Sequence, residues 1–149
     1  MSHLDYIRTV EDAFKKLGIN PNDAKAPIQG AWIFKRGSAT IRVMLNSTPT
    51  SEGEQKTLAM MAHISEMPRR KQRQFYRRLL EMNSSFITER FEIFDNEIYL
   101  TASRYLEGLD SDEVVDMMKE ISETADFVDD RIKKEFADAF GPPQPKTKK

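Results

Sequence analysis

Residues 86–106, FITERFEIFDNEIYLTASRYL, carry the strongest indication of the fold of this chain. Two β-rich runs, 86–94 and 97–106, are separated only by Asp95-Asn96. Both turn residues tolerate the positive backbone angles of a tight turn, so the stretch is typical of an antiparallel β-hairpin. An isolated hairpin is only marginally stable, so further strands or a packed helix are expected in the neighbouring sequence.

Helical patterns lie on both sides of this hairpin. Upstream, Pro68 suits the first turn of a helix and an apolar stripe follows it, which predicts a helix over 69–82. Downstream, Asp110 or Ser111 can cap a long last helix over 111–138. Its apolar residues recur at spacings of three and four: Val114, Met118, Ile121, Ala125, Val128, Ile132 and Phe136.

The N-terminal part predicts one more helix and a second hairpin. Apolar residues at helical spacing, ending before Gly18, favour a helix over 3–17. Alternating runs at 28–34 and 39–45 then favour two strands that turn at Arg36-Gly37. In the second run the odd-numbered residues are apolar and the even-numbered ones are mainly polar, which indicates a sheet with one buried face.

The middle of the chain is harder to assign. Residues 47–54 hold a proline and a glycine among polar residues, so a loop is expected there. Residues 56–65 are expected to form a strand, although their composition also suits a helix. The resulting order, α-β-β-β-α-β-β-α, predicts an α+β fold with a mainly antiparallel five-stranded sheet. A single domain is expected over 1–140, followed by a disordered Pro/Lys tail over 141–149.

Composition excludes several classes of protein. The 149 residues are 39% hydrophobic and 32% charged, with a net charge of -1, which fits one globular domain and gives no overall attraction to nucleic acid or membranes. The absence of cysteine excludes disulfides and thiolate metal sites. No apolar run reaches the length of a membrane helix, and the N-terminus is too acidic for a signal peptide, so a cytoplasmic location is expected.

No catalytic or cofactor-binding constellation is present. His3 and His63 are the only histidines and lie far apart in the sequence, which argues against a metal site. No nucleophile elbow, phosphate-binding loop or dinucleotide fingerprint occurs. Acidic residues at 126, 129 and 130 fit a solvated helix face better than an acid–base pair. We therefore expect no cofactor, no metal and no enzymatic activity.

Charge is unevenly distributed along the chain. A basic patch at the start of the middle helix could grip phosphates or an acidic protein segment; it consists of Arg69, Arg70, Lys71, Arg73, Arg77 and Arg78. The last helix is instead strongly acidic. Either the two helices meet within one subunit or they meet across a dimer, and nucleic-acid binding by the patch is the less favoured alternative.

Methionine is abundant, with eight residues in 149. Thioethers fill cores but also suit surfaces that bind varied apolar segments. Met44 and Met61 fall on the strand faces opposite the main apolar residues. If that face is open, it offers Trp32 or Ile33, Met44 and Met61 as a binding patch for a partner peptide.

The segments 79–83, 91–100 and 106–110 together resemble one known group of proteins. Their sequences are LLEMN, FEIFDNEIYL and LEGLD. The chain is similar to YbjN-like domains and, more distantly, to class I type III secretion chaperones of the Tir-chaperone type, over roughly residues 3–138. Ser84-Ser85 stand where the chaperones often have glycines.

This resemblance implies a small cytoplasmic homodimer without a cofactor. In such chaperones the middle helix and a neighbouring strand form the dimer contact, which here implicates Phe75, Leu79, Met82 and Phe86. The chaperones hold an extended segment of a protein client against apolar grooves, which is recognition by strand addition with pockets for side chains. The expectation for this chain is a non-enzymatic, chaperone-like protein-binding module.

Overall fold

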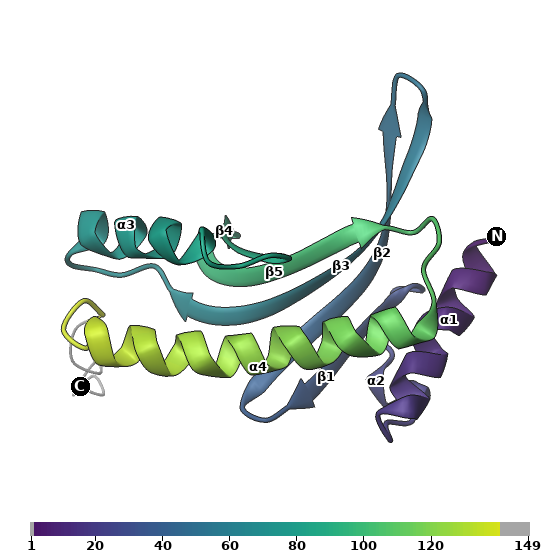
Figure 1. Ribbon diagram of the computed structural model, residues 1–149, viewed down its shortest axis with the longest axis horizontal. Helices are drawn as coiled ribbons and strands as arrows, with labels where there is room; N and C mark the ends of the chain where they lie inside the picture. The colour runs from purple at the N-terminus through teal and green to yellow at the C-terminus, as the bar shows by residue number, and fades with distance from the viewer. Residues whose placement is uncertain (1, 141–149) are drawn as a thin grey trace, which may run out of the picture.

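A computed structural model describes residues 2–140 of the chain; the tail expected over 141–149 lies outside the described residues. Residues 2–140 form four helices and five strands (Figure 1). In order they are α1 His3–Lys16, α2 Pro21–Ala24, β1 Ala31–Arg36, β2 Ala39–Thr50, β3 Gly53–Glu66, α3 Gln72–Asn83, β4 Glu89–Phe94, β5 Glu97–Tyr105 and α4 Ser111–Glu135. The predicted α+β class and the predicted order of elements are confirmed, with the short helix α2 added.

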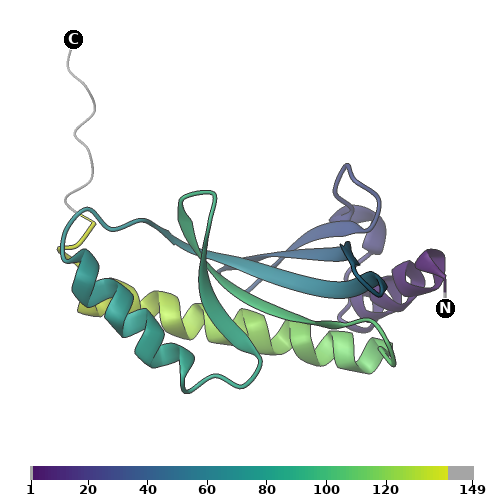
Figure 2. The same cartoon turned by 90° about the horizontal axis from the view of Figure 1, so that it is seen from above.

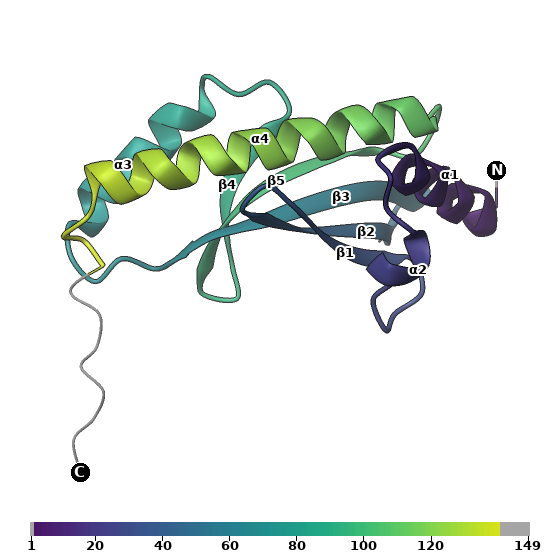
Figure 3. The ribbon, with the colours of Figure 1, turned by 90° about the horizontal axis from the view of Figure 1, so that it is seen from below.

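The sheet is entirely antiparallel, with strand order β1-β2-β3-β5-β4. The long helix α4 lies across one face, and α1 and α3 lie near the two ends of α4 (Figure 2). Within residues 2–140 the other face carries none of these three helices, and the short helix α2 lies beside the edge strand β1 (Figure 3). Residues of alternate parity on each strand point to these two faces. The predicted separation of buried and open faces on 39–45 is confirmed, because Ile41 and Val43 are fully buried while Arg42 is exposed.

The core lies between the sheet and α4, and Figure 3 shows this helix crossing the strands. Apolar residues of α4 at helical spacing, such as Val114, Met118 and Ile121, are fully buried there. Asp110 caps the helix as predicted, since its side chain accepts a hydrogen bond of 2.8 Å from the Glu113 N–H. The sequence pattern therefore placed this helix and its buried stripe correctly.

The loop expected over 47–54 is wrong. β2 and β3 continue past the other strands as a two-stranded ribbon, paired from Asn46↔Thr57 to Thr50↔Gly53 (Figure 1). Hydrophobic alternation could not reveal this ribbon, because every residue from 46 to 56 is exposed and polar or small.

Other boundaries also differ from the sequence prediction. The strand expected over 28–34 is found at Ala31–Arg36, because the chain turns at Gly30, which has a left-handed backbone with φ 83°. α3 begins at Gln72 rather than 69, because Lys71 has a left-handed backbone with φ 55°. The strand expected from 86 begins at Glu89, and the helix expected to reach 138 ends at Glu135. The strand predicted for 56–65 is confirmed within β3, so the helical alternative for this segment is wrong.

Candidate functional site

The sheet has two edges, β1 and β4, and each lies beside an apolar concavity. An edge strand presents backbone N–H and C=O groups without partners in the sheet, and proteins usually protect such an edge. The β2–β3 ribbon has this protection, because Pro49 lacks an N–H and Glu54 and Lys56 carry charge. The two outer strands, β1 and β4, are therefore the candidate edges for binding another strand.

At the β4 edge, α3 and β4 enclose a groove of about 320 Å³. Asn83 closes one end, since its Oδ1 accepts a hydrogen bond of 2.8 Å from the Phe91 backbone N–H. The lining is almost entirely apolar; it consists of Tyr76, Leu79, Leu80, Asn83, Phe91, Glu92, Ile93 and Ile98.

Several large apolar side chains of α3, β4 and the segment between them are exposed to solvent. The exposed fractions are 70% for Leu80, 96% for Ile87, 57% for Ile93 and 53% for Phe94. Leu80 and Ile93, which both line the groove, are called the α3–β4 surface below. Phe94 points to the other face of the sheet, where its ring packs on Tyr99 at a centroid distance of 5.9 Å. Concentrated exposed apolar side chains of this kind mark an interaction site more often than a free surface.

The residues that the sequence assigned to a dimer contact lie under this surface rather than on it. Phe75, Leu79 and Met82 are buried in the core of the subunit. Phe86 is half-buried and packs on Phe91, with ring centroids 5.7 Å apart. These side chains are therefore used within the subunit, and a dimer contact through the middle helix stays a prediction.

At the other edge, the segment before β1 covers only part of the strand. Ala26 donates its N–H to the Ala31 carbonyl at 3.0 Å, and Lys25 forms an isolated antiparallel bridge with Trp32. The Ala31 carbonyl therefore points outward, and backbone alternation turns the N–H and C=O groups of Ile33 and Lys35 the same way. No other strand in residues 2–140 pairs with the outer edge of β1 beyond this bridge, although the short helix α2 lies beside it (Figure 3).

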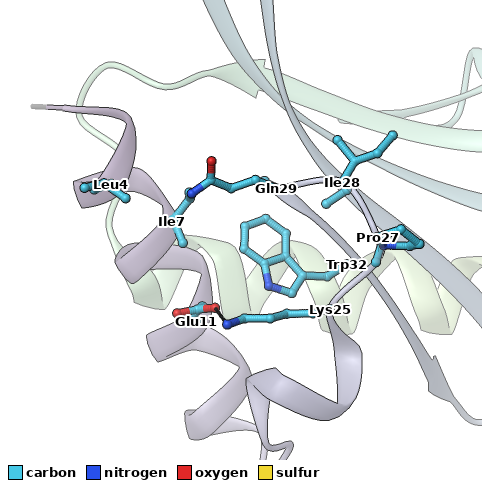
Figure 4. Close-up of a pocket in the computed structure, with 11 residues that line it drawn as sticks. Leu4, Ile7, Glu11, Lys25, Pro27, Ile28, Gln29 and Trp32 are labelled. Carbon is cyan, nitrogen blue, oxygen red and sulfur yellow. Dashed lines mark ion pairs between the residues drawn. The ribbon is translucent and has the colours of Figure 1, made fainter.

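A pocket of about 470 Å³ lies between α1 and the start of β1 (Figure 4). We call it the α1–β1 pocket. Its lining residues are Leu4, Ile7, Glu11, Lys25, Ala26, Pro27, Ile28, Gln29, Gly30, Ala31 and Trp32. An ion pair of 3.7 Å between Lys25 Nζ and Glu11 Oε2 lies beside the indole of Trp32. The pocket combines apolar walls with a charged base, a pattern common in ligand sites.

The residues predicted to bind a partner peptide separate onto both faces of the sheet. Trp32 is 2% exposed and faces the core, so it is not part of an open-face patch. Its alternative, Ile33, is on the open face with Met44 and Met61, because the sheet register aligns these residues. Ile33 is 43% exposed and Met44 is partly exposed, whereas Met61 is only 7% exposed. Sequence alone did not reveal that Trp32 instead lines the α1–β1 pocket.

The basic patch contacts the acidic end of α4 within the same subunit. Lys71 Nζ is 2.7 Å from Asp138 Oδ2, and Arg78 Nε is 2.9 Å from Glu135 Oε1. The hydrogen bond from Lys71 lowers the pKa of Asp138. The first of the two alternatives for the charged helices is therefore correct.

The other cations of the patch have mixed surroundings. Arg77 lies 3.6 Å from Glu81 on its own helix. Arg69 and Arg70 both donate their backbone N–H groups to the Ala139 carbonyl, while the Arg73 side chain is exposed. Much of the patch thus joins α3 to the end of α4, and nothing in its geometry favours nucleic acid.

Titratable groups do not assemble into a reactive centre in residues 2–140. No group of three or more potential metal ligands occurs there. His63 Nε2 lies 2.7 Å from Glu97 Oε1 on the sheet surface. The pKa of Glu120 is raised, chiefly by its hydrogen bond with Glu89. Over the same residues, no helix is both long and apolar enough to span a membrane.

Comparison with known proteins shows a likeness in structure only. No family model matches the sequence, and no curated protein matches it. A chain from the structure of the Yersinia pestis type III secretion chaperone SycH in complex with a stable fragment of YscM2 is similar, with a TM-score of 0.56 and 12% identity. The match covers 82% of this chain and 98% of that chain.

A chain from the HopA1–SchA chaperone–effector complex is also similar, with a TM-score of 0.50 and 11% identity. The match covers 79% of this chain and 93% of that chain. At such low identity the comparisons establish architecture and not activity. The chain has the α+β fold of type III secretion chaperones, while its resemblance to YbjN-like domains stays a prediction.

Proposed function

We propose that this chain is a non-enzymatic, chaperone-like protein-binding module that acts as a homodimer and binds an extended segment of a partner protein. The observation that carries the proposal is that each of the two edge strands, β1 and β4, lies beside a mainly apolar concavity. Strand addition requires an open strand edge, and side-chain pockets give it specificity. The fold shared with chaperones that were solved with protein partners supports the same reading.

The α3–β4 surface is the part that we assign to self-association. Leu80 and Ile93 both line the groove and are both more than half exposed. A two-fold axis would place this surface against its own copy, so each exposed apolar residue would find apolar contacts. The open edge of β4 adds backbone groups that a second β4 can pair.

The β1 edge and the α1–β1 pocket are the part that we assign to the partner segment. An extended chain that pairs with Ile33 and Lys35 would run beside the pocket mouth, where Ile28 is 75% exposed. The two assigned surfaces use opposite edges of the sheet, since β1 and β4 are its outermost strands. A dimer formed through β4 therefore leaves both copies of β1 accessible.

Self-association is tested by multi-angle light scattering. The wild-type chain should have the molar mass of a dimer, and Leu80→Asp combined with Ile93→Asp should reduce it to that of a monomer. Ile28→Asp is the matched control, because it also adds a charge at an exposed isoleucine but lies at the other end of the sheet. A monomeric wild type, or a dimer that is insensitive to the double variant, would contradict the dimer assignment.

Partner binding is tested by affinity capture from the native cytoplasm after nuclease treatment. A single near-stoichiometric protein should be captured by the wild type and lost with Lys35→Pro, which removes an outward N–H without removing a bond to β2. Lys35→Ala keeps that N–H and should retain the partner. Capture that occurs only when the nuclease treatment is omitted would support the alternative function of the basic patch.

A further inference from the structure

The base of the α1–β1 pocket holds two buried polar atoms without hydrogen-bond partners. Trp32 Nε1 and Glu11 Oε2 both lack such a partner among residues 2–140. The Lys25 ammonium is 3.7 Å from Glu11 Oε2, which is longer than a hydrogen bond. Buried donors and acceptors are nearly always satisfied in folded proteins, so an unsatisfied donor and acceptor in one pocket require an explanation.

The two atoms occupy one end of a mainly apolar pocket, and the side chain of Gln29 lies on the far side of the Trp32 ring from them. In Figure 4 the indole nitrogen is on the side of the ring toward Glu11 and Lys25, and the side chains of Ile7 and Ile28 lie on the other sides of the ring. Trp32 is held in this position by the core, where its ring contacts Phe14 at a centroid distance of 6.1 Å. The donor is therefore rigid, and a ligand must bring its polar group to it.

The chemistry of these two atoms restricts the ligand. A matching group must accept a hydrogen bond from the indole N–H and donate one to the Glu11 carboxylate. An ammonium group cannot accept, and a carboxylate cannot donate and is repelled by Glu11. A hydroxyl does both with a single oxygen atom. A primary amide also does both, but the short polar side chains that carry one leave the apolar walls unfilled.

The walls decide which hydroxyl fits. They are formed by Leu4, Ile7, Pro27 and Ile28, which favour an apolar body behind the polar tip. Serine and threonine are too short to span such walls, whereas a phenol has a flat apolar ring that ends in a hydroxyl. The ligand chemistry is thus a phenol.

We propose that the α1–β1 pocket takes the side chain of a tyrosine in the bound partner segment, whose hydroxyl accepts from Trp32 Nε1 and donates to Glu11 Oε2. The source of the tyrosine rests on the proposed function, because the unpaired part of the β1 edge begins at Ile33, directly after the pocket residue Trp32. Lys25 covers the polar base and moves aside on binding. This movement is easy because Lys25 is 53% exposed and its long ion pair contributes little stability.

The test uses the single tryptophan of the chain, whose indole N–H gives one resolved signal in a ¹⁵N–¹H NMR spectrum. The probes are 4-methylphenol and toluene, which differ only in the hydroxyl group. The phenol should move the indole signal downfield and bind about tenfold more tightly than toluene, since two hydrogen bonds form. Equal affinities, or an unchanged indole signal, would overturn the proposal without any substitution in the protein.

Two variants separate the hydrogen-bonding role from general packing. Glu11→Ala should weaken 4-methylphenol binding about tenfold and leave toluene binding unchanged. Asp12→Ala is the matched control, because it removes the adjacent but exposed carboxylate of the same helix. Lys25→Ala should tighten phenol binding about two- to fivefold, because the competing ion pair is removed. Weaker phenol binding by Lys25→Ala would contradict the role of Lys25 as a movable cover.

A second pair of probes identifies the source of the phenol. N-acetyltyrosinamide should bind and N-acetylphenylalaninamide should bind about tenfold more weakly. Binding of 4-methylphenol without binding of N-acetyltyrosinamide would exclude a tyrosine residue and indicate a free phenolic ligand. These results do not depend on dimer formation or on capture of a partner, so failure of the proposed function and failure of the tyrosine pocket are distinguishable.

Discussion

The side-chain oxygen of Asn83, the last residue of α3, accepts a 2.8 Å hydrogen bond from the backbone N–H of Phe91 in β4. This N–H therefore points away from β5, and alternation along the strand turns the backbone groups of Ile93 outward as well. The bond fixes the end of α3 beside the sheet edge and sets Leu80 and Ile93 on the same groove. A local polar contact thus positions the surface that we assign to self-association.

Removing this contact should destabilise the subunit. Asn83→Ala leaves the part-buried Phe91 N–H without its acceptor, and the expected loss is about 1–3 kcal/mol in the free energy of unfolding. Asn83→Asp keeps an acceptor and should lose less. Asn46→Ala, on the exposed ribbon, is the control and should change little. Urea denaturation measures all three, and equal effects of the two alanine variants would contradict this account.

Adjacent leucines of α3 should separate stability from assembly. Leu79 is 6% exposed and lies in the core, so Leu79→Ala should lower the free energy of unfolding by about 2–5 kcal/mol. Leu80 is 70% exposed, so Leu80→Ala should barely affect the stability of the isolated subunit but should weaken the dimer. The measurements are the concentration dependence of the molar mass and urea denaturation at a fixed low protein concentration.

The opposite pattern would place the contact elsewhere. If Leu80→Ala left the dimer dissociation constant unchanged while Leu79→Ala raised it with no loss of subunit stability, the original assignment of the contact to Leu79 would be correct. The burial of Leu79 would then have to change on dimer formation.

The sequence predicted the fold because its apolar periodicities are strong where one face is buried. The hairpin at Asp95-Asn96 and the stripe of α4 are examples, and both were located to within a few residues. The β2–β3 ribbon was missed because neither of its faces is buried, so its strands have no hydrophobic alternation to detect. The start of α3 was missed because it depends on a left-handed Lys71, a residue type that rarely indicates such a backbone.

The candidate surfaces were predicted less well than the fold. A dimer contact on the middle helix stays a prediction, and periodicity alone could not tell that the stripe with Phe75 and Leu79 faces the core while Leu80 faces solvent. The sequence could not place Trp32 on the correct face, because the face depends on the register of the β1–β2 hairpin. That register pairs Trp32 with the buried Val43. The pocket between α1 and β1 joins segments that no local pattern connects.

The carboxyl pair Glu89 and Glu120 gives a prediction about pH. The pKa of Glu120 is raised above its ordinary value of 4.5, chiefly by the hydrogen bond with Glu89, so the folded state binds its proton more tightly than the unfolded state. Stability therefore falls as the pH rises through the raised pKa. Glu120→Gln removes this loss and should stabilise the chain at pH 7, by less than about 1 kcal/mol because Glu120 is partly screened by water.

The advantage of Glu120→Gln should shrink as the pH is lowered toward about 4, where the wild-type carboxyl is itself protonated. Thermal or urea denaturation across this range measures the difference. Glu107→Gln, at an exposed position before α4, is the control and should show no such trend. If the stabilisation by Glu120→Gln grew toward low pH, the pKa of Glu120 would be lowered in the folded state and not raised.

Gly37 and Gly18 offer a matched pair for testing how the β1–β2 turn contacts α4. Both have positive φ, +62° and +78°, so replacement by alanine should cost each about 1–2 kcal/mol of backbone strain. A Cβ at Gly37 would also collide with Asp126 Oδ2, whereas a Cβ at Gly18 meets no atom within 4 Å. When Asp126 moves, it loses the hydrogen bond that it accepts from the Ser38 hydroxyl, which lowers the free energy of unfolding by about 1 kcal/mol more. Gly37→Ala should therefore be the more destabilising variant in urea denaturation. When both glycines are replaced in an Asp126→Ala background, their additional losses should be equal, because the carboxylate and its hydrogen bond are already absent. Equal losses for the two glycines would show that the turn does not depend on its contact with α4.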